Sequence, residues 1–160
     1  MELNKHICTQ FVEKEKEFMQ LTLDDDYIVK DNKPDVLRII YSNGNVALED
    51  IKIGNQVVWL TGKLYFSTLY QSDDENHRLE SIRGEIPFQE KIVMDTREDC
   101  EELTADIQIE DLSIGIINSR KLTIRAVLNA EVKCMEEETE EFCCMTPLEG
   151  YEQKTEELTM

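Results

Sequence analysis

Basic residues are scarce in this sequence. Its 160 residues include 17 Lys and Arg against 35 Asp and Glu, which gives a formal net charge of −18 at pH 7. Because phosphate binding requires clustered Lys and Arg, this balance argues against a nucleic-acid surface and against adhesion to anionic lipid. It favours solubility, a basic protein partner or a crowded assembly.

Long apolar runs are also missing. No run approaches the ~18–20 residues of a membrane span. The N-terminal stretch "MELNKHICTQ" has no apolar segment typical of a signal peptide. We therefore expect no membrane insertion and a cytoplasmic location. The chain length fits one domain, or at most two small ones, whose core needs neither a metal nor a disulfide for stability.

Catalytic and metal-binding patterns are missing as well. The sequence contains no Gly-rich phosphate loop, no nucleophile elbow and no His-Glu-x-x-His motif. Of its two histidines, His6 and His77, the second lies in a polar loop and is expected to be a solvated side chain. The stretch "DDDYIVKDN" offers oxygen ligands for calcium but lacks the spacing and the glycine of an EF-hand. We expect no enzyme, no cofactor and no metal site.

The five cysteines are odd in number and fit no zinc-site spacing; they are Cys8, Cys100, Cys134, Cys143 and Cys144. The adjacent pair Cys143-Cys144 allows a vicinal disulfide or a redox pair, although a cytosolic chain favours reduced thiols. A small hydrolase or redox protein that uses this pair is one alternative function. It requires a His or a basic group beside the two thiols.

Alternating apolar residues predict that most of the chain is β-strand. The patterns at 45–53 and 56–70 are separated by Gly54-Asn55, a two-residue link typical of a hairpin. The patterns at 103–116 and 122–134 are joined by a polar turn and predict a longer antiparallel hairpin. The sequence therefore predicts a mainly β fold, either an antiparallel β-sandwich or a strongly bent sheet.

Three local features refine this prediction. The pattern at 56–70 is apolar on both faces, which indicates a central strand or one that passes between layers. In the strand region that follows, Gly84 and Pro87 mark a bulge or an edge position. A change of phase near Asp111 indicates a β-bulge.

The stretch "KPDVLRIIY" at 33–41 differs from the rest because its apolar residues have helical spacing. Pro34 and Asp35 are favoured in the first turn of a helix, and Gly44 can end one. The sequence predicts one short helix near 34–41. We expect this helix to bury Ile39 and Ile40 and to expose Lys33 and Arg38.

Aromatic residues cluster in the strand pattern at 56–70 and permit two interpretations. Their strand positions favour packing in the core; they are Trp59, Tyr65, Phe66 and Tyr70. Alternatively they form a platform for carbohydrate, which requires Trp59 or a row of tyrosines on the surface. The alternative function is thus a carbohydrate- or cell-wall-binding β-sandwich. Arg38 and Arg83 are candidates for pairing with acidic side chains and equally for plain surface positions.

Four short motifs occur in a fixed order along the chain. They comprise Lys33, Pro34 and Asp35 followed by Ile39 and Ile40, then Gly62 in "TGKL", then Pro87 and Phe88, and finally Asn118, Arg120 and Lys121. In this order and spacing, over roughly residues 18–134, the chain resembles the SPOCS domain of SipL-type spore coat morphogenesis proteins of clostridia and relatives. We expect these motif residues to be structural, and the partner-binding residues stay unassigned.

The resemblance implies a non-enzymatic protein–protein interaction or assembly module of a sporulation protein. SipL-like proteins act at the forespore surface in the mother-cell cytoplasm, where they bind the coat-basement ATPase, stage IV sporulation protein A. They usually carry a C-terminal LysM module, which these 160 residues lack, and recruitment is attributed mainly to that module. The chain also has Lys30 where the family often has a second proline. A homo-oligomer is compatible with the resemblance.

The composition changes after Met135. The stretches "EEETEEF" and "LEGYEQKTEELTM" are acidic and weakly apolar, like a linker or tail. We expect a SPOCS-like β domain at 1–135 and an acidic linker at 136–160 that leads to further domains.

Overall fold

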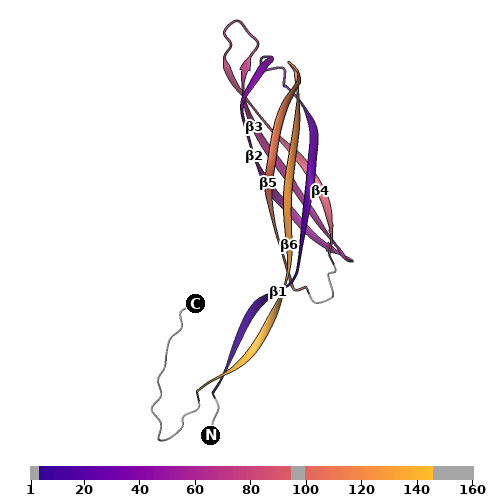
Figure 1. Cartoon of the computed structure of the whole chain (residues 1–160), viewed down its shortest axis with the longest axis vertical. Helices are drawn as coiled ribbons and strands as arrows, with labels where there is room; N and C mark the ends of the chain where they lie inside the picture. The colour runs from indigo at the N-terminus through magenta and orange to yellow at the C-terminus, as the bar shows by residue number, and fades with distance from the viewer. Residues whose placement is uncertain (1–3, 95–99, 146–160) are drawn as a thin grey trace. The chain divides into compact units, whose positions relative to one another are not determined.

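Six long strands make up the fold, and all of them pair antiparallel where the register is described. The computed structural model describes residues 4–94 and 100–145, and the side chains of 7–94 and 100–141. The strands are β1 (Asn4–Ile28), β2 (Val36–Gly54), β3 (Val57–Ser72), β4 (Leu79–Val93), β5 (Glu102–Asn118) and β6 (Lys121–Met145). They form two three-stranded sheets, ordered β1-β6-β5 and β2-β3-β4 (Figure 1). The prediction of a mainly β fold is confirmed.

The chain divides into two compact units. The larger, Glu13–Glu136, contains β2 to β5 together with β1 from Glu13 and β6 as far as Glu136. The smaller combines Met1–Val12 with Glu137–Met160, and in its described part the hydroxyls of Thr9 and Thr139 lie 3.5 Å apart. The expected boundary after residue 135 stays a prediction, and β6 itself continues to Met145.

The core lies between the two sheets of the larger unit and follows from strict alternation on their central strands. Every second residue of β3 from Val58 to Ser72 is buried, because successive side chains of a strand point to opposite faces. The central strand of the other sheet behaves in the same way. Its inward set matches the prediction: Leu122, Ile124, Ala126, Leu128, Ala130, Val132 and Cys134.

The predicted helix near 34–41 is wrong. The segment from Val36 onward is the start of β2, which pairs with β3 along its whole length. Two register shifts, between Val36 and Arg38 and between Ile39 and Tyr41, each place an extra residue in β2. Such bulges break the period of two, so the apolar residues of a strand here acquire a spacing that imitates a helix.

The predicted burial of this segment is correct only in part. Ile40 sits at the second bulge and is 46% exposed, and Ile39 is half-buried. Arg38 is exposed as expected, whereas Lys33 is half-buried. The burial prediction therefore fails for Ile40, because a bulged strand at a sheet edge turns this side chain toward solvent.

Two glycine–phenylalanine pairs hold β3 against β4. Gly62 lies opposite Phe88 in the register, and Phe66 lies opposite Gly84. A Cβ atom at Gly62 would lie 2.6 Å from Cζ of Phe88 and 2.5 Å from the carbonyl oxygen of Ala47. At Gly84 it would meet the ring of Phe66. Each phenylalanine ring thus occupies the space that the opposite glycine leaves empty.

The predicted hairpin, edge position and bulge are confirmed, although the hairpin link is Asn55-Gln56, one residue later than the predicted Gly54-Asn55. The hairpin link follows Gly54, and Gln56 takes a positive φ of 60° in it. β4, which contains Pro87, is an edge strand. The register of β5 and β6 shifts between Ile109 and Asp111. A disulfide that sequence reasoning did not anticipate joins Cys100 to Cys134, whose Cα atoms lie 5.5 Å apart.

The described part of the chain contains no helix that is long and apolar enough to cross a membrane.

Candidate functional site

Five of the family-motif residues meet at one end of the larger unit. The loop at 29–35 joins β1 to β2 and contains Lys33, Pro34 and Asp35. The turn between β5 and β6 contains Asn118 and Arg120 and lies against this loop. Because β1 and β2 belong to different sheets, the loop is the point at which the chain crosses between them. We call the loop at 29–35 together with Ser119 and Arg120 the clasp.

The guanidinium group of Arg120 is the centre of the clasp. Its Nη1 donates to the carbonyl oxygen of Lys33 at 2.7 Å and to Oδ1 of Asp35 at 3.0 Å. Its Nη2 donates to the carbonyl oxygens of Val29 and Lys30 at 3.1 and 3.0 Å. The planar fork of an arginine can serve several acceptors at once, which a lysine ammonium cannot do in the same geometry. One side chain therefore satisfies most of the loop's inward-facing carbonyls.

Ser119 binds the same loop from the other side of the turn. Its hydroxyl donates to Oδ2 of Asp35 at 2.8 Å, and its carbonyl oxygen accepts from the backbone N–H of Val36 at 2.8 Å. The side-chain oxygen of Asn118 accepts from the backbone N–H of Arg120 at 2.9 Å and so fixes the turn. The hydrogen bond from Ser119, followed by the bond and the charge of Arg120, lowers the pKa of Asp35 below its usual 3.8.

The second sheet contributes a buried phenol and a carboxylate. Tyr70 on β3 is completely buried, and its hydroxyl donates to the carbonyl oxygen of Pro34 at 3.1 Å. Burial, and then the charge of Glu80, raises the pKa of Tyr70 above its usual 10.0. The ammonium of Lys33 lies 3.1 Å from the carboxylate of Glu80 on β4. The clasp therefore connects to both sheets.

The remaining motif residues lie outside the clasp. Lys121 pairs with Asp26 at the end of β1, with 2.6 Å between Nζ and Oδ2. Gly62 and Phe88 pack against each other between β3 and β4. Sequence reasoning missed Ser119 and Tyr70. Ser119 is part of a motif already noticed, while Tyr70 carried no signal beyond being one aromatic among several.

The aromatic residues divide between core and surface. Phe66 and Tyr70 are buried as predicted. Trp59 and Tyr65 are 40% and 39% exposed, so the prediction of core packing is wrong for both. They alternate with the buried residues of β3 and point away from the core.

The side chains of the clasp hold its backbone. The carboxylate of Asp35 accepts from Ser119 and Arg120. The carbonyl groups of Val29, Lys30 and Lys33 accept from Arg120, and that of Pro34 accepts from Tyr70. Across the described residues, no group of three or more His, Cys, Asp or Glu side chains is arranged to hold a metal ion. The side chains of Cys143 and Cys144 lie outside the described residues, so the prediction of reduced thiols there stays a prediction.

The lowered pKa of Asp35 predicts a specific pH dependence. The pKa of Asp35 is lower in the folded than in the unfolded chain, so its ionised carboxylate stabilises the fold. This stabilisation is fully present above the unfolded pKa of about 3.8 and is lost as the pH falls through the folded pKa. We expect the difference in free energy of unfolding between the wild type and Asp35→Asn to be constant above about pH 5 and to shrink below it. Urea unfolding of both proteins from pH 7 to pH 2 measures this difference. A difference that does not change with pH would contradict the lowered pKa of Asp35.

The comparisons with known proteins agree with this structural interpretation. The family model described as SipL, SPOCS domain matches residues 35–117, slightly more than half of the chain. The match starts at Asp35 in the clasp and ends one residue before Asn118. Neither the curated proteins nor the solved structures contain a match. The family indicates a module of a sporulation-related protein, and the chain belongs to the SipL SPOCS domain family.

Proposed function

We propose that the chain is a non-enzymatic assembly module of a sporulation protein and that it binds a protein partner through neighbouring edges of its two sheets. The family match supports the link to sporulation. The observation that carries the proposal is a set of exposed apolar side chains on two adjacent edge strands. A partner would contact these exposed side chains, because the two strand edges lie against each other.

The two edge strands concerned are β2 and β5. Each is the outer strand of its sheet. The backbone N–H of Val36 donates to the carbonyl oxygen of Ser119 at 2.8 Å, and a Cβ at Gly44 would meet the side chain of Leu112. Residues 36–44 of β2 therefore run alongside residues 112–119, in the opposite direction.

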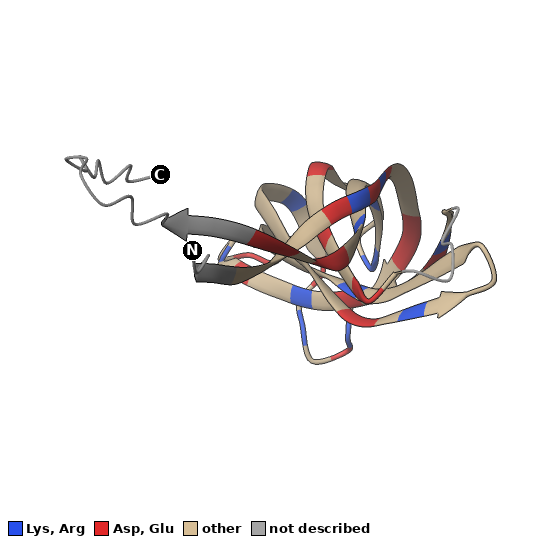
Figure 2. Ribbon diagram, turned by 90° about the horizontal axis from the view of Figure 1, so that it is seen from below, with Lys and Arg blue, Asp and Glu red and all other residues tan. Residues whose placement is uncertain are grey.

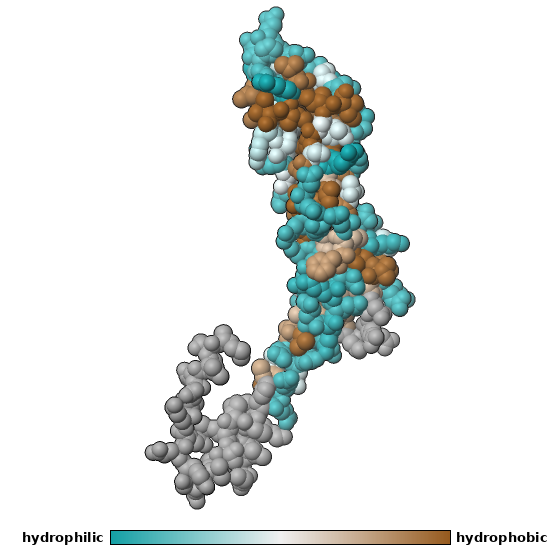
Figure 3. Space-filling view, viewed as in Figure 1, coloured by the Kyte–Doolittle hydropathy of each residue, from teal (hydrophilic) through white to brown (hydrophobic). Residues whose placement is uncertain are grey.

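Exposed apolar residues line this junction. We call them the edge patch: Leu37, Ile40 and Tyr41 of β2, with 44%, 46% and 61% exposed, and Ile116 and Ile117 of β5, with 40% and 50% exposed. Figure 3 shows apolar side chains gathered over the end of the larger unit where β2 begins. Single exposed apolar residues are ordinary, but a contiguous group of this kind is typical of an interaction surface.

The local charge also suits a protein interface. Residues 36–48 contain one basic residue, Arg38, and no acidic residue, although 35 of the 160 residues are Asp or Glu. The centres of protein interfaces are depleted in charged residues and enriched in aromatic and large apolar ones. The edge patch thus has the composition of an interface centre within an acidic protein.

For the partner we propose the coat-basement ATPase, stage IV sporulation protein A, with the chain located in the mother-cell cytoplasm at the forespore surface. This proposal rests on the family alone. The carbohydrate alternative is less favoured, since the exposed Trp59 and Tyr65 are six positions apart on one strand, about 20 Å. Rings at that separation do not form one stacking platform.

A pull-down from sporulating cells tests the proposed function. The bait carries the full chain as wild type or with Ile40→Ser, Tyr41→Ser and Ile117→Ser together, and mass spectrometry identifies the captured proteins. We expect the wild type to capture a coat-assembly protein, and we expect the variant to capture at least ten-fold less of that protein. The matched control is Val93→Ser, which changes a 72% exposed residue at the far end of β4.

Two outcomes contradict the proposed function. The first is that the wild type recovers no coat-assembly protein. The second is that Val93→Ser reduces the amount of captured coat-assembly protein as much as the edge-patch variant does. Thermal unfolding of each purified variant shows that a loss of capture does not come from loss of the fold.

A further inference from the structure

A second surface, the outward face of the β2-β3-β4 sheet, has a charge balance unlike that of the whole chain. Its side chains alternate with the buried ones of the core. It carries five of the chain's 17 basic residues but only three of its 35 acidic residues. The basic residues are Arg38, Lys52, Lys63, Arg83 and Lys91, and the acidic ones are Glu49, Asp50 and Glu85. Figure 2 colours basic and acidic residues along the strands.

The three acidic residues of this face are already paired. Nζ of Lys63 lies 3.5 Å from Glu49 and 3.1 Å from Glu85. Nζ of Lys52 lies 2.8 Å from Asp50. Two lysines therefore neutralise most of the negative charge on this face, and three basic residues are left over.

Those three residues are available to a ligand to different degrees. Nε of Arg38 donates to the side-chain oxygen of Gln71 at 2.8 Å. Arg83 and Lys91, both exposed on β4, form no ion pair with any described residue. Of the two interpretations of Arg83, a partner for acids or plain surface, the described residues fit the second. A guanidinium without a described ion-pair partner is unusual in a chain with twice as many acidic as basic residues.

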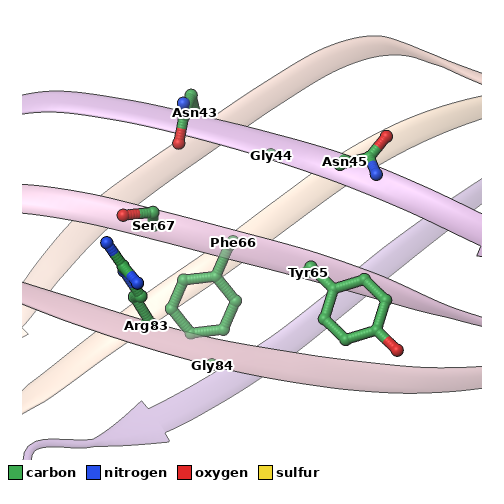
Figure 4. A pocket seen from close by; sticks show the side chains of 8 residues that line it. All are labelled: Asn43, Gly44, Asn45, Tyr65, Phe66, Ser67, Arg83 and Gly84. Carbon is green, nitrogen blue, oxygen red and sulfur yellow. The ribbon is translucent and has the colours of Figure 1, made fainter.

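Arg83 also lines a hollow in the middle of this face. The hollow measures about 260 Å³, and its lining includes Asn43 and Asn45 of β2, Tyr65 and Ser67 of β3, and Arg83. Figure 4 shows these side chains on three neighbouring strands, with Arg83 extending toward Ser67.

The register explains why the surface is hollowed there. Gly44, Phe66 and Gly84 lie opposite one another across the three strands. The ring of Phe66 is buried in the core, and the two glycines have no side chain. Backbone therefore forms the floor of the hollow. On one side of this floor stand the outward side chains of Asn43, Ser67 and Arg83, and on the other side stand those of Asn45 and Tyr65.

The chemistry of this lining suits a carboxylate on a peptide. A guanidinium binds a carboxylate through two parallel hydrogen bonds, and the amides of Asn43 and Asn45 can donate to or accept from a peptide backbone. The half-exposed ring of Tyr65 offers apolar area with a polar tip. Charges on other faces of the protein are screened over about 8 Å at physiological ionic strength. The balance of basic and acidic residues on this face therefore has the larger effect on which ligands bind here.

We propose that the outward face of the β2-β3-β4 sheet binds an extended acidic segment of a partner protein, with one carboxylate held by Arg83 in the hollow. Arg83 and Lys91 lie eight positions apart on β4, about 26 Å. Well-separated carboxylates match this arrangement, whereas the closely spaced phosphates of a nucleic acid would meet Glu85 and Asp50. The inference relies on the proposed function as a protein interaction module. It concerns the middle of this face, whereas only Tyr41 of the edge patch reaches the face, beside Asn43.

A synthetic peptide tests the inference with the full chain. The probe is an acetylated and amidated nine-residue peptide with Glu at positions 1, 5 and 9 and alternating Thr and Val elsewhere, and the matched probe carries Gln at the same three positions. We expect NMR titration at 0.15 M NaCl to shift the signals of Asn43, Asn45, Tyr65 and Ser67 with the Glu peptide. Arg83→Gln should weaken binding at least five-fold, and Arg125→Gln, which removes a cation from the other sheet, should leave it unchanged.

Three outcomes would overturn the inference. They are equal binding of the Gln peptide, binding that Arg83→Gln leaves unchanged, and tighter binding of oligothymidylate or alginate than of the Glu peptide. A variant with Ile40→Ser and Ile117→Ser alone separates this inference from the proposed function. It leaves Tyr41 beside Asn43 unchanged, so it should lose the coat-assembly protein yet keep the peptide. Arg83→Gln should show the reverse pattern.

Discussion

Replacement of Arg120 by alanine is expected to lower the free energy of unfolding by about 3 kcal/mol. The reason is that it removes the N–H groups that donate to the carbonyl oxygens of Lys33, Val29 and Lys30. Hydrogen bonds to a charged group contribute about 1.5–3 kcal/mol each, but the guanidinium is one-third exposed and water replaces part of what is lost. The loss should be larger than that of an ordinary surface ion pair. Urea unfolding followed by circular dichroism measures it.

Two matched variants decide whether geometry or charge matters at Arg120. Arg125→Ala removes two hydrogen bonds to Oδ2 of Asp24 from an exposed position and should change the free energy of unfolding by less than about 1 kcal/mol. Arg120→Lys keeps the charge but not the planar fork, and it should lose most of what alanine loses. If Arg120→Lys unfolds at the wild-type urea concentration, the clasp depends on charge alone and the multidentate interpretation is wrong.

Gly62→Ala should destabilise the fold nearly as much as Arg120→Ala, and we expect it to lower the free energy of unfolding by about 2 kcal/mol. The added Cβ would lie 2.5 Å from the carbonyl oxygen of Ala47 and 2.6 Å from the ring of Phe88. The ring can rotate away, but the carbonyl oxygen belongs to the paired backbone of β2, so strands must separate. Overpacking of this kind costs about 1–3 kcal/mol.

The control for this prediction is another glycine of the same sheet. A Cβ at Gly54 would meet only the carbonyl oxygen of Val57, at 3.5 Å, which is an ordinary contact. Gly54→Ala should therefore change stability by less than about 0.5 kcal/mol. Equal losses at Gly54 and Gly62 in thermal unfolding would show that glycine flexibility, rather than the space occupied by Phe88, sets the effect.

Periodicity made most of the fold predictable. The alternation of Leu122 through Cys134 identified the buried face of β6, and the Gly54-Asn55 link located a hairpin to within one residue. These signals are local, since a strand with one buried face must alternate. The helix at 34–41 failed because two bulges in β2 altered the period, and a bulge is defined by its pairing with another strand.

The candidate sites were less predictable because they depend on distant pairs. The motif residues Asp35 and Arg120 were both singled out, yet only the fold shows that they lie 3.0 Å apart. Tyr70 appeared to be one of several core aromatics, and nothing in the sequence reports that its hydroxyl reaches Pro34. That Arg83 has no ion-pair partner among the described residues is likewise a property of its neighbours on β3 and β2 rather than of its own sequence context.

The pairing of the first strand with the last has a consequence for biosynthesis. β1 ends at Ile28 and hydrogen-bonds to β6, which begins at Lys121, so its partner starts to leave the ribosome only after more than ninety further residues have been added. At about 5–20 residues per second this interval is roughly 5–20 seconds. During that time the β2-β3-β4 sheet can form from hairpins alone, whereas β1 stays without a neighbour. The apolar residues of β1, such as Leu21 and Leu23, are then accessible to chaperones and to other nascent chains until β6 emerges.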